Sequence, residues 1–357
     1  MAESALTQAS TRETALDEAL VYAERAARFS LWDYKSHQFL GVVQEMKGDL
    51  AGAERSLRKS ANLAGNYADA NWALGNLLLR EGKIGEAIPP LRKAASASED
   101  LFPLTYDLLW RFANGDLSPL RELARNNPSA ELSLVQFLLD QSMIDQALST
   151  FRSIDRQARV ASPKSPGIIR TLIGAGRLVE ARALWLELVT DRATESAIVW
   201  NGGFEENSVK LFNHFDWTLA PSPYARIGID STQAHTGGRS LKITFAGRDT
   251  TTLKDEIKQL IWLRPGARYR LEFYVLTKDL LSPEGPRVAI FNETNAVALS
   301  APVPEGTTND WQRIALEFIA PTNQKPNFLA IVRLPKFSYD DPTRGAVWFD
   351  DFHLTEL

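Results

Sequence analysis

The sequence predicts a multidomain α and β protein in which an α-helical solenoid is followed by an antiparallel β-sandwich. Three observations lead to this expectation. Residues of the same type recur every 34 positions in the N-terminal half. Helical periodicity ends near Val189, and from Ile198 onward apolar and polar residues alternate between turns rich in glycine, proline and asparagine. Two short motifs, Asn201-Gly-Gly-Phe-Glu205 and Trp348-Phe-Asp-Asp-Phe-His-Leu354, bracket the alternating part.

Length and composition fit a two-domain protein and exclude several functions. The chain has 357 residues, and a domain usually takes about 100–200. A net charge of -4 gives no reason to expect nucleic acid as a partner. The absence of cysteine excludes disulfides, thiolate nucleophiles and sulfur-ligated zinc. No apolar run of about 18 residues predicts a membrane span, and any leader or anchor is expected to be absent from this chain.

The N-terminal half begins with an expected helix at about residues 12–29 and then repeats. Three pairs keep an offset of 34, namely Gly41 and Gly75, Ala53 and Ala87, and Leu57 and Leu91. The stretch from Asn71-Trp-Ala-Leu-Gly75 to Ala94 resembles a tetratricopeptide repeat. This resemblance implies pairs of helices whose small residues lie where the two backbones cross, and a surface that binds a protein or peptide partner.

The repeat becomes irregular farther along the chain. Ala147 and Ala181 are again 34 apart, but the distance from Ala87 to Ala147 is 60 residues. A shortened unit is therefore expected around residues 114–127, where Pro119 and Pro128 would each begin a helix, because proline is tolerated in a first turn. We expect nine to eleven helices in all.

The domain boundary is expected near residue 195. The segment from Asp191 to Ser196 is polar and contains no long apolar stripe. The helical domain would thus comprise residues 1–195 and the strand domain residues 196–357, joined by a short linker that lets the two pack together.

The C-terminal half alternates in eight runs. A tight hairpin turn is expected at Arg264-Pro-Gly-Ala-Arg268, between the third and the fourth of them. Short turns between such runs indicate an antiparallel sandwich of jelly-roll type. The runs cover residues 225–229, 240–245, 258–263, 269–275, 287–291, 311–318, 328–333 and 347–349.

This half resembles the carbohydrate-binding modules that accompany xylanases and β-glucanases, on the strength of the two bracketing motifs together with Gly238-Arg-Ser-Leu-Lys242 and Asp310-Trp311. The resemblance implies polysaccharide binding and a structural calcium ion near the two chain ends. Glu205, Asp350 and Asp351 lie in the matching motifs, and backbone carbonyls near Gly237 and Gly238 could complete such a site. The alternative is that Glu205 caps a turn and one aspartate faces solvent.

Strand parity suggests where a sugar would bind. In a simple hairpin around Pro265, Ile261 and Leu263 share the core side with Tyr269, Leu271 and Phe273. The opposite side then carries the predicted ligand-binding residues. An outer face of this composition offers aromatic rings for sugar CH groups and polar groups for hydroxyls. Alternatively the helices cover this face, with Trp262 and Tyr274 in the domain interface. The predicted residues are Trp262, Glu272, Tyr274, Arg287 and Arg313.

No pattern of residues predicts catalysis. The four histidines are scattered, and neither a Gly-x-Ser-x-Gly elbow nor a phosphate-binding glycine loop occurs. The sequence therefore favours a non-catalytic adaptor of bacterial surface polysaccharide assembly or export, located in the periplasm or at the cell surface. A structural scaffold whose sandwich binds no sugar is the alternative, and a glycan-active enzyme is a more distant one.

Overall fold

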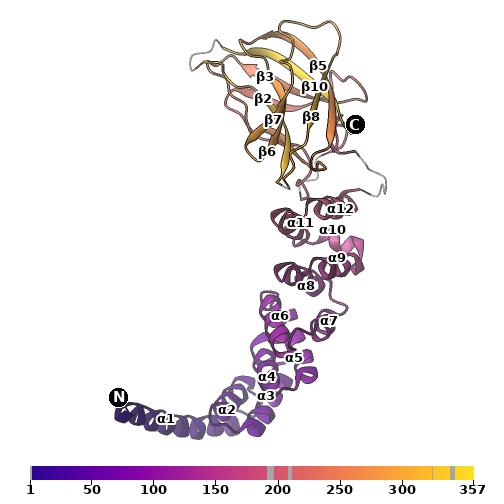
Figure 1. Ribbon diagram of the computed structural model, residues 1–357. Coiled ribbons are helices and arrows are strands. Elements are labelled where there is room, and N and C mark those ends of the chain that lie inside the picture. Colours follow the sequence, from indigo (N-terminus) through magenta and orange to yellow (C-terminus); the bar gives the residue numbers. More distant parts are fainter. Residues whose placement is uncertain (1, 191–196, 208–210, 324, 338–341) are drawn as a thin grey trace. The chain divides into compact units, whose positions relative to one another are not determined.

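The computed structural model describes residues 2–190, 197–207, 211–323, 325–337 and 342–357, with side chains from residue 13 onward (Figure 1). Twelve helices precede ten strands among these residues, so the expected number of nine to eleven helices was too low. The chain divides into two compact units, Met1–Lys164 and Ser165–Leu357. The last helix ends at Val189, where helical periodicity was expected to end. The predicted boundary near residue 195 lies outside the described residues and stays a prediction.

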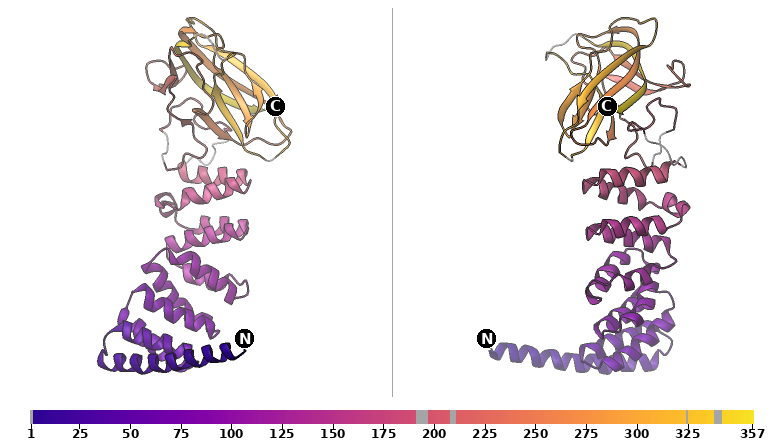
Figure 2. Two further views of the ribbon diagram at one scale, coloured as in Figure 1. Left: turned by 90° about the vertical axis from the view of Figure 1, so that its left-hand side faces the viewer. Right: turned by 45° about the vertical axis from the view of Figure 1, so that its right-hand side comes forward.

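The first unit is built from ten helices among its described residues, and they are stacked in sequence order (Figure 2). Two further helices, α11 (Ser165–Gly174) and α12 (Leu178–Val189), belong to the second unit. The ten are α1 (Ala2–Phe29), α2 (Tyr34–Met46), α3 (Leu50–Ala64), α4 (Ala68–Arg80), α5 (Ile84–Ala97), α6 (Leu101–Phe112), α7 (Ser118–Ala124), α8 (Pro128–Asp140), α9 (Ile144–Ser153) and α10 (Arg156–Ala161).

The 34-residue offset corresponds to a contact between a glycine and a leucine of the next helix, which occurs in two consecutive helix pairs. A Cβ atom placed on Gly41 in α2 would lie 2.6 Å from Cγ of Leu57 in α3, and one on Gly75 in α4 would lie 2.5 Å from Cγ of Leu91 in α5. Only glycine lets each pair of helices approach this closely. The repeated Leu-Gly spacing therefore fixes how both pairs cross.

The irregular part of the repeat is a shortened helix between longer ones. Helix α7 has seven residues with Pro119 in its first turn, and α8 begins at Pro128, so both prolines begin helices as predicted. The side chain of Asn127 accepts hydrogen bonds from the N–H groups of Ser129 and Ala130 at 3.1 and 3.3 Å, which caps α8.

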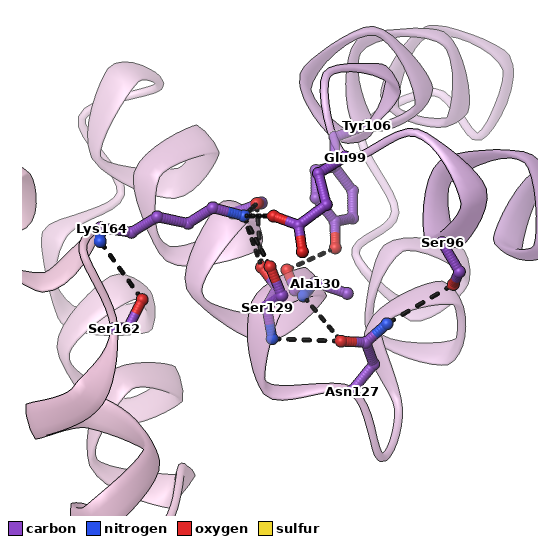
Figure 3. Close-up of polar contacts among 9 residues, drawn as sticks. Ser96, Glu99, Tyr106, Asn127, Ser129, Ala130, Ser162 and Lys164 are labelled. Carbon is purple, nitrogen blue, oxygen red and sulfur yellow. Dashed lines mark hydrogen bonds and ion pairs between the residues drawn. The ribbon is translucent and has the colours of Figure 1, made fainter.

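A lysine at the end of the first unit ties its last helices together (Figure 3). The Lys164 ammonium group donates to Oγ of Ser129 and of Ser133, both at 2.8 Å, and pairs with Glu99 at 3.0 Å. The Ser129 hydroxyl and Lys164 hold the pKa of Glu99 below its usual value. One side chain thus joins the segments before α6, in α8 and after α10.

The second unit contains ten strands among its described residues, arranged as two five-stranded antiparallel sheets. We call the sheet with order β1-β4-β9-β6-β7 the first sheet, and the sheet with order β2-β3-β10-β5-β8 the second sheet. The strands are β1 (Thr218–Leu219), β2 (Ala225–Asp230), β3 (Ser240–Ala246), β4 (Ile257–Ile261), β5 (Arg268–Leu281), β6 (Arg287–Asn292), β7 (Asn295–Leu299), β8 (Gln312–Ile319), β9 (Asn327–Val332) and β10 (Arg344–Glu356).

Both sheets contribute to one hydrophobic core. The first sheet supplies Ile290 and Leu329, and the second supplies Phe273 and Phe349, all fully buried in the same cluster. Along each of these strands the alternate residues point away from that core. Each sheet therefore has an outer face, and the two outer faces lie on opposite sides of the core.

Helices α11 and α12 pack within the second unit through one tryptophan. Trp185 is fully buried, and its indole N–H donates to the carbonyl of Phe212 at 2.6 Å. Its ring meets Trp200 edge-on at 5.0 Å and Phe215 at 5.6 Å between centroids. This cluster explains why the two helices group with the strands. No described helix of the chain combines the length and apolar character needed to cross a membrane.

Candidate functional site

The two bracketing motifs lie side by side in the folded chain. The N–H of Phe352 donates to the carbonyl of Gly202 at 3.0 Å. Phe204 packs against Trp217 and Phe352, with centroid distances of 5.2 and 6.0 Å. All three rings are core residues. The motifs therefore close the second unit by joining the start of its strand region to its last strand, β10.

The carboxylate of Glu205 is held by the turn before β3. Its Oε1 accepts hydrogen bonds from the N–H groups of Gly238 and Arg239, both at 2.8 Å. Gly237 has a positive φ of 64°, and a Cβ there would collide with this carboxylate. Because glycine alone fits, the Gly237-Gly238 pair positions the two N–H groups that Glu205 binds.

Asp350 and Asp351 contact the same turn from a β-bulge in β10. Asp350 is fully buried and accepts from the N–H of His235 at 2.7 Å and of Asp351 at 2.8 Å. Burial raises the pKa of Asp350 to about 6, against these two hydrogen bonds, which lower it. Asp351 has a φ of 49° and lies 2.6 Å from Nδ1 of His235 and 2.8 Å from Oγ1 of Thr236.

This donor set does not fit the predicted calcium ion. Ca²⁺ takes six to eight oxygen ligands, whereas the turn offers N–H groups and an imidazole to Glu205, Asp350 and Asp351. Among the residues that the structure describes, no three acidic, histidine or cysteine side chains are grouped closely enough to hold a metal. Calcium at Glu205, Asp350 and Asp351 thus stays an untested prediction that this arrangement does not support.

The predicted sorting of residues by strand parity is confirmed for the core side. Ile261, Leu263, Tyr269, Leu271 and Phe273 all belong to the one hydrophobic core. The turn at residues 264–268 also forms, because the N–H of Ala267 donates to the carbonyl of Arg264 at 3.2 Å.

The simple hairpin is wrong, however, because β4 and β5 lie in different sheets. The turn carries the chain across the core, so the residues opposite the core side end on two separate outer faces. Trp262 follows β4 on the first sheet, whereas Glu272 and Tyr274 lie on the second.

Three of the five predicted ligand-binding residues meet on the outer face of the second sheet. Arg313 in β8 lies opposite Tyr274 in β5 and pairs with Glu272 at 3.5 Å. The Tyr274 ring is not open, since the imidazole of His235 stacks on it at 3.6 Å between centroids and 14° between planes. Trp311 lies 5.8 Å from the same imidazole. Tyr274 is therefore already paired with another ring.

The other two predicted residues lie on the first sheet and apart from that group. Arg287 in β6 pairs with Glu284 at 3.2 Å and donates to the carbonyl of Ser300 at 3.1 Å. Trp262 lines a small cavity of about 250 Å³ with Arg177, which precedes α12, and with Val179 in the first turn of α12. Trp262 thus lies beside the start of α12, whereas Tyr274 lies against His235, and a domain interface formed by the two stays a prediction.

A larger trough on the outer face of the first sheet was missed from the sequence. Its volume is about 780 Å³, within the range of about 300–1,000 Å³ that small-molecule sites usually have. Strand pairing places Phe291 of β6 directly opposite Phe328 of β9, and Ala289 opposite Ala330. Two aromatic side chains therefore stand beside two small ones, which leaves the hollow between them. We call this hollow the aromatic trough, lined by Lys254, Asp255, Lys258, Phe291, Glu293, Thr294, Phe328, Ala330, Val332 and Leu334.

Charged groups stand on both sides of the aromatic trough. Lys258 in β4 lies 5.6 Å from the centre of the Phe328 ring and pairs with Asp255 at 2.8 Å. On the other side Glu293 pairs with Lys325 at 2.7 Å. These side chains are partly exposed, so each keeps hydrogen-bonding capacity toward a ligand.

The sequence offered little signal for the trough. In β6 and β9 the residues on both faces are apolar, so alternation does not separate an inner from an outer face there. The pairing of Phe291 with Phe328 depends on the register between strands that are distant in sequence, which a single strand does not reveal.

Comparisons with known proteins give only remote likenesses. Neither a family model nor a curated protein matches the chain. Solved structures match 44–45% of the chain, over its C-terminal strand-bearing half. A family 4 carbohydrate-binding module is 20% identical, with 99% of that chain covered and a TM-score of 0.33.

Two further structures show the same level of similarity. A Stig cyclase, Fisc from Fischerella sp. TAU, in complex with a pyrrolidinylidene indole, is 17% identical, with 96% of it covered and a TM-score of 0.33. The CBM22-1 and GH10 modules of Clostridium thermocellum xylanase 10B, complexed with xylohexaose, are 15% identical, with 29% covered and a TM-score of 0.31. At these values the likenesses carry no argument about what this chain binds or catalyses.

Proposed function

We propose that this protein is a non-catalytic adaptor that binds a polysaccharide in the aromatic trough and a protein partner on its helices. In this proposal the second unit is a jelly-roll sandwich of the carbohydrate-binding type, and the helix pairs are tetratricopeptide-like. Its place would be outside the cytoplasmic membrane, in the assembly or export of bacterial surface polysaccharide.

The observation that carries the proposal is the apposition of Phe291 and Phe328 beside Ala289 and Ala330. A sugar ring presents CH groups on its faces and hydroxyls around its rim. The CH groups pack on aromatic rings, while the hydroxyls exchange hydrogen bonds with charged and amide groups. The trough supplies both kinds of contact, because Lys258 and Glu293 stand at its sides.

The helical half supports the adaptor role through its repeated contact. Gly41 against Leu57 and Gly75 against Leu91 give two helix pairs the same crossing. Stacked pairs of this kind create extended surfaces on which partners bind. Tyr34 and Tyr67, one from each of two consecutive pairs, stack at 5.3 Å and are accessible for such contacts.

The proposal is tested by retention on affinity gels that carry xylan, β-glucan or β-1,4-galactan. We expect the wild-type protein to be retained by at least one gel. Phe328→Ala should weaken that retention about tenfold, because one of two stacking rings is lost. Tyr274→Ala is the matched control, since it removes a ring of similar size from the other outer face.

The outcomes separate the candidates. Loss of retention in Tyr274→Ala but not in Phe328→Ala would place the site on the second sheet and contradict the trough. Release of soluble sugar from a gel would contradict the non-catalytic part. If no gel retains the protein, the second candidate function, a structural scaffold, is favoured. The observation that supports a scaffold is the buried Trp185 cluster, which joins α12 to the strand region.

A further inference from the structure

Among the residues that the structure describes, the outer side of helix α1 exposes a stripe of apolar and charged side chains that no described helix of the first unit covers. Helix α1 forms the end of the helical stack in the first unit and packs chiefly against α2 (Figure 2). The side toward α2 carries Ala23 and Ala27, which are 0% and 6% exposed. On the opposite side Tyr22 is 67% exposed and Phe29 is 80% exposed.

Such exposure is unusual for a helix of a stack. Stacked helix pairs bury their apolar faces against neighbours, and a face left outside the stack is normally polar. Here the stripe continues into the turn after α1, where Trp32 is 86% exposed. Large apolar side chains exposed on one side of a helix and in the turn after it indicate an interaction site.

The stripe is complementary to itself in charge. Its members between residues 14 and 29 are Thr14, Glu18, Val21, Tyr22, Arg25 and Phe29, all exposed. If two copies of α1 run antiparallel about a twofold axis between Val21 and Tyr22, each member faces another member of the same set. Thr14 then faces Phe29, Val21 faces Tyr22, and Glu18 faces Arg25 of the second copy.

The charges on the stripe indicate that its binding partner is a second copy of the chain. A twofold interface uses the same patch on both molecules, so its residues must satisfy each other. Glu18 and Arg25 carry opposite charges at symmetric positions, and the axis produces the pair twice. Arg25 also lies over the Phe29 ring at 5.8 Å, which holds its guanidinium within the stripe.

We propose that this stripe is a homodimer interface, in which two copies of the chain pack their α1 helices antiparallel. One helix from each copy gives an interface at the low end of the size range, below about 1,200 Å². The dimer is therefore weak and depends on concentration. It presents two aromatic troughs and two helical surfaces per particle, which strengthens attachment to a repetitive polymer.

The test is sedimentation equilibrium of the full-length protein from about 1 µM to about 1 mM, a range that covers weak association. The wild type should pass from monomer to dimer in this range. Glu18→Arg and Arg25→Glu should each weaken dimerisation about tenfold, because two ion pairs become like-charged pairs. The double variant Glu18→Arg/Arg25→Glu restores both pairs and should return to within about threefold of the wild type.

Glu13→Arg is the control, because it makes the same charge change on α1 outside the stripe. Circular dichroism of each variant checks that α1 still forms. A wild type that stays monomeric throughout overturns the proposal. So does a dimer whose affinity is unchanged in both single variants, or one that the double variant fails to restore.

Discussion

The outer faces of the two sheets both carry aromatic side chains, but they use them differently. On the second sheet the rings are already engaged, since Tyr274 is stacked by His235 and the indole N–H of Trp348 donates to Asp230 at 2.6 Å. On the first sheet Phe291 and Phe328 flank an open trough. The comparison teaches that an aromatic residue on an outer face becomes a candidate platform when its ring borders an open hollow. The Lys258 ammonium, 5.6 Å from the centre of the Phe328 ring, still leaves the aromatic trough open.

The largest effect is expected for Trp348→Ala, which tests whether the second sheet's aromatics are structural. Trp348 is only 5% exposed, with the Lys242 ammonium 4.7 Å from its ring centre. Truncating such a ring costs about 3–5 kcal/mol of unfolding free energy, to be measured by urea denaturation. Polysaccharide retention of the folded variant should equal that of the wild type. Retention lost at little cost in stability would instead make this face the binding face.

The carboxylate of Asp230 also shows that the aromatic side chains of the second sheet are engaged within the chain, because it accepts the indole N–H of Trp348. Partial burial alone would raise its pKa, but hydrogen bonds from Trp348 and Thr232 outweigh burial and lower the pKa to about 2. The carboxylate therefore stays ionised beneath the indole at any ordinary pH.

The next effect concerns Asp350, whose pKa is raised from 3.8 to about 6 in the folded chain. Between these values the folded chain binds more protons than the unfolded chain, so stability should fall as pH rises from about 4 to about 6, and stay level above. Asp350→Asn should remove about 3 kcal/mol of this pH dependence. The measurement is the difference between the two proteins' urea midpoints at several pH values, which cancels titrations that they share. Parallel curves would contradict the assignment to Asp350.

A smaller effect is expected for Lys258→Gln at the edge of the aromatic trough. The change removes the charge near Phe328 and the ion pair with Asp255 but keeps a hydrogen-bond donor. Because exposed charged contacts contribute little, retention on the polysaccharide gel should fall about threefold or less. Lys242→Gln, which changes a lysine on the other outer face, should leave retention unchanged. Equal losses in both variants would show a general effect of charge.

The smallest effect is expected from calcium. Because N–H groups and an imidazole occupy the carboxylates of Glu205, Asp350 and Asp351, adding a chelator should leave the thermal midpoint unchanged. Isothermal titration with CaCl₂ gives the independent check. A rise in the midpoint with calcium, accompanied by heat of binding, would restore the calcium prediction and require the turn at residues 235–239 to rearrange.

Features that depend on residues near each other in sequence could be predicted well. The resemblance to a tetratricopeptide repeat implied small residues at helix crossings, and Gly41 and Gly75 each lie against a leucine of the next helix. Pro119 and Pro128 begin helices because local backbone chemistry decides that outcome. The core residues of β5 followed from alternation, since Tyr269, Leu271 and Phe273 share one face of a strand.

Features that depend on pairing between distant strands could not be predicted. Alternation fixes which residues share a face of one strand, but not which sheet the strand joins. Trp262 was therefore grouped with Tyr274, although the turn between them changes sheet. The opposition of Phe291 and Phe328 needs the register of β6 with β9, and neither strand's own pattern contains it.

The hydrogen bonds of Lys164 indicate where the chain can be divided into separately expressed fragments. All the partners of its ammonium group described above precede it in the chain, whereas Trp185 packs against residues that follow it. A fragment that ends with α12 would therefore contain Trp185 without the residues that bury its indole ring, and we expect this fragment to aggregate. Expression of the two halves should instead divide the gene after codon 164, where each product keeps its own contacts.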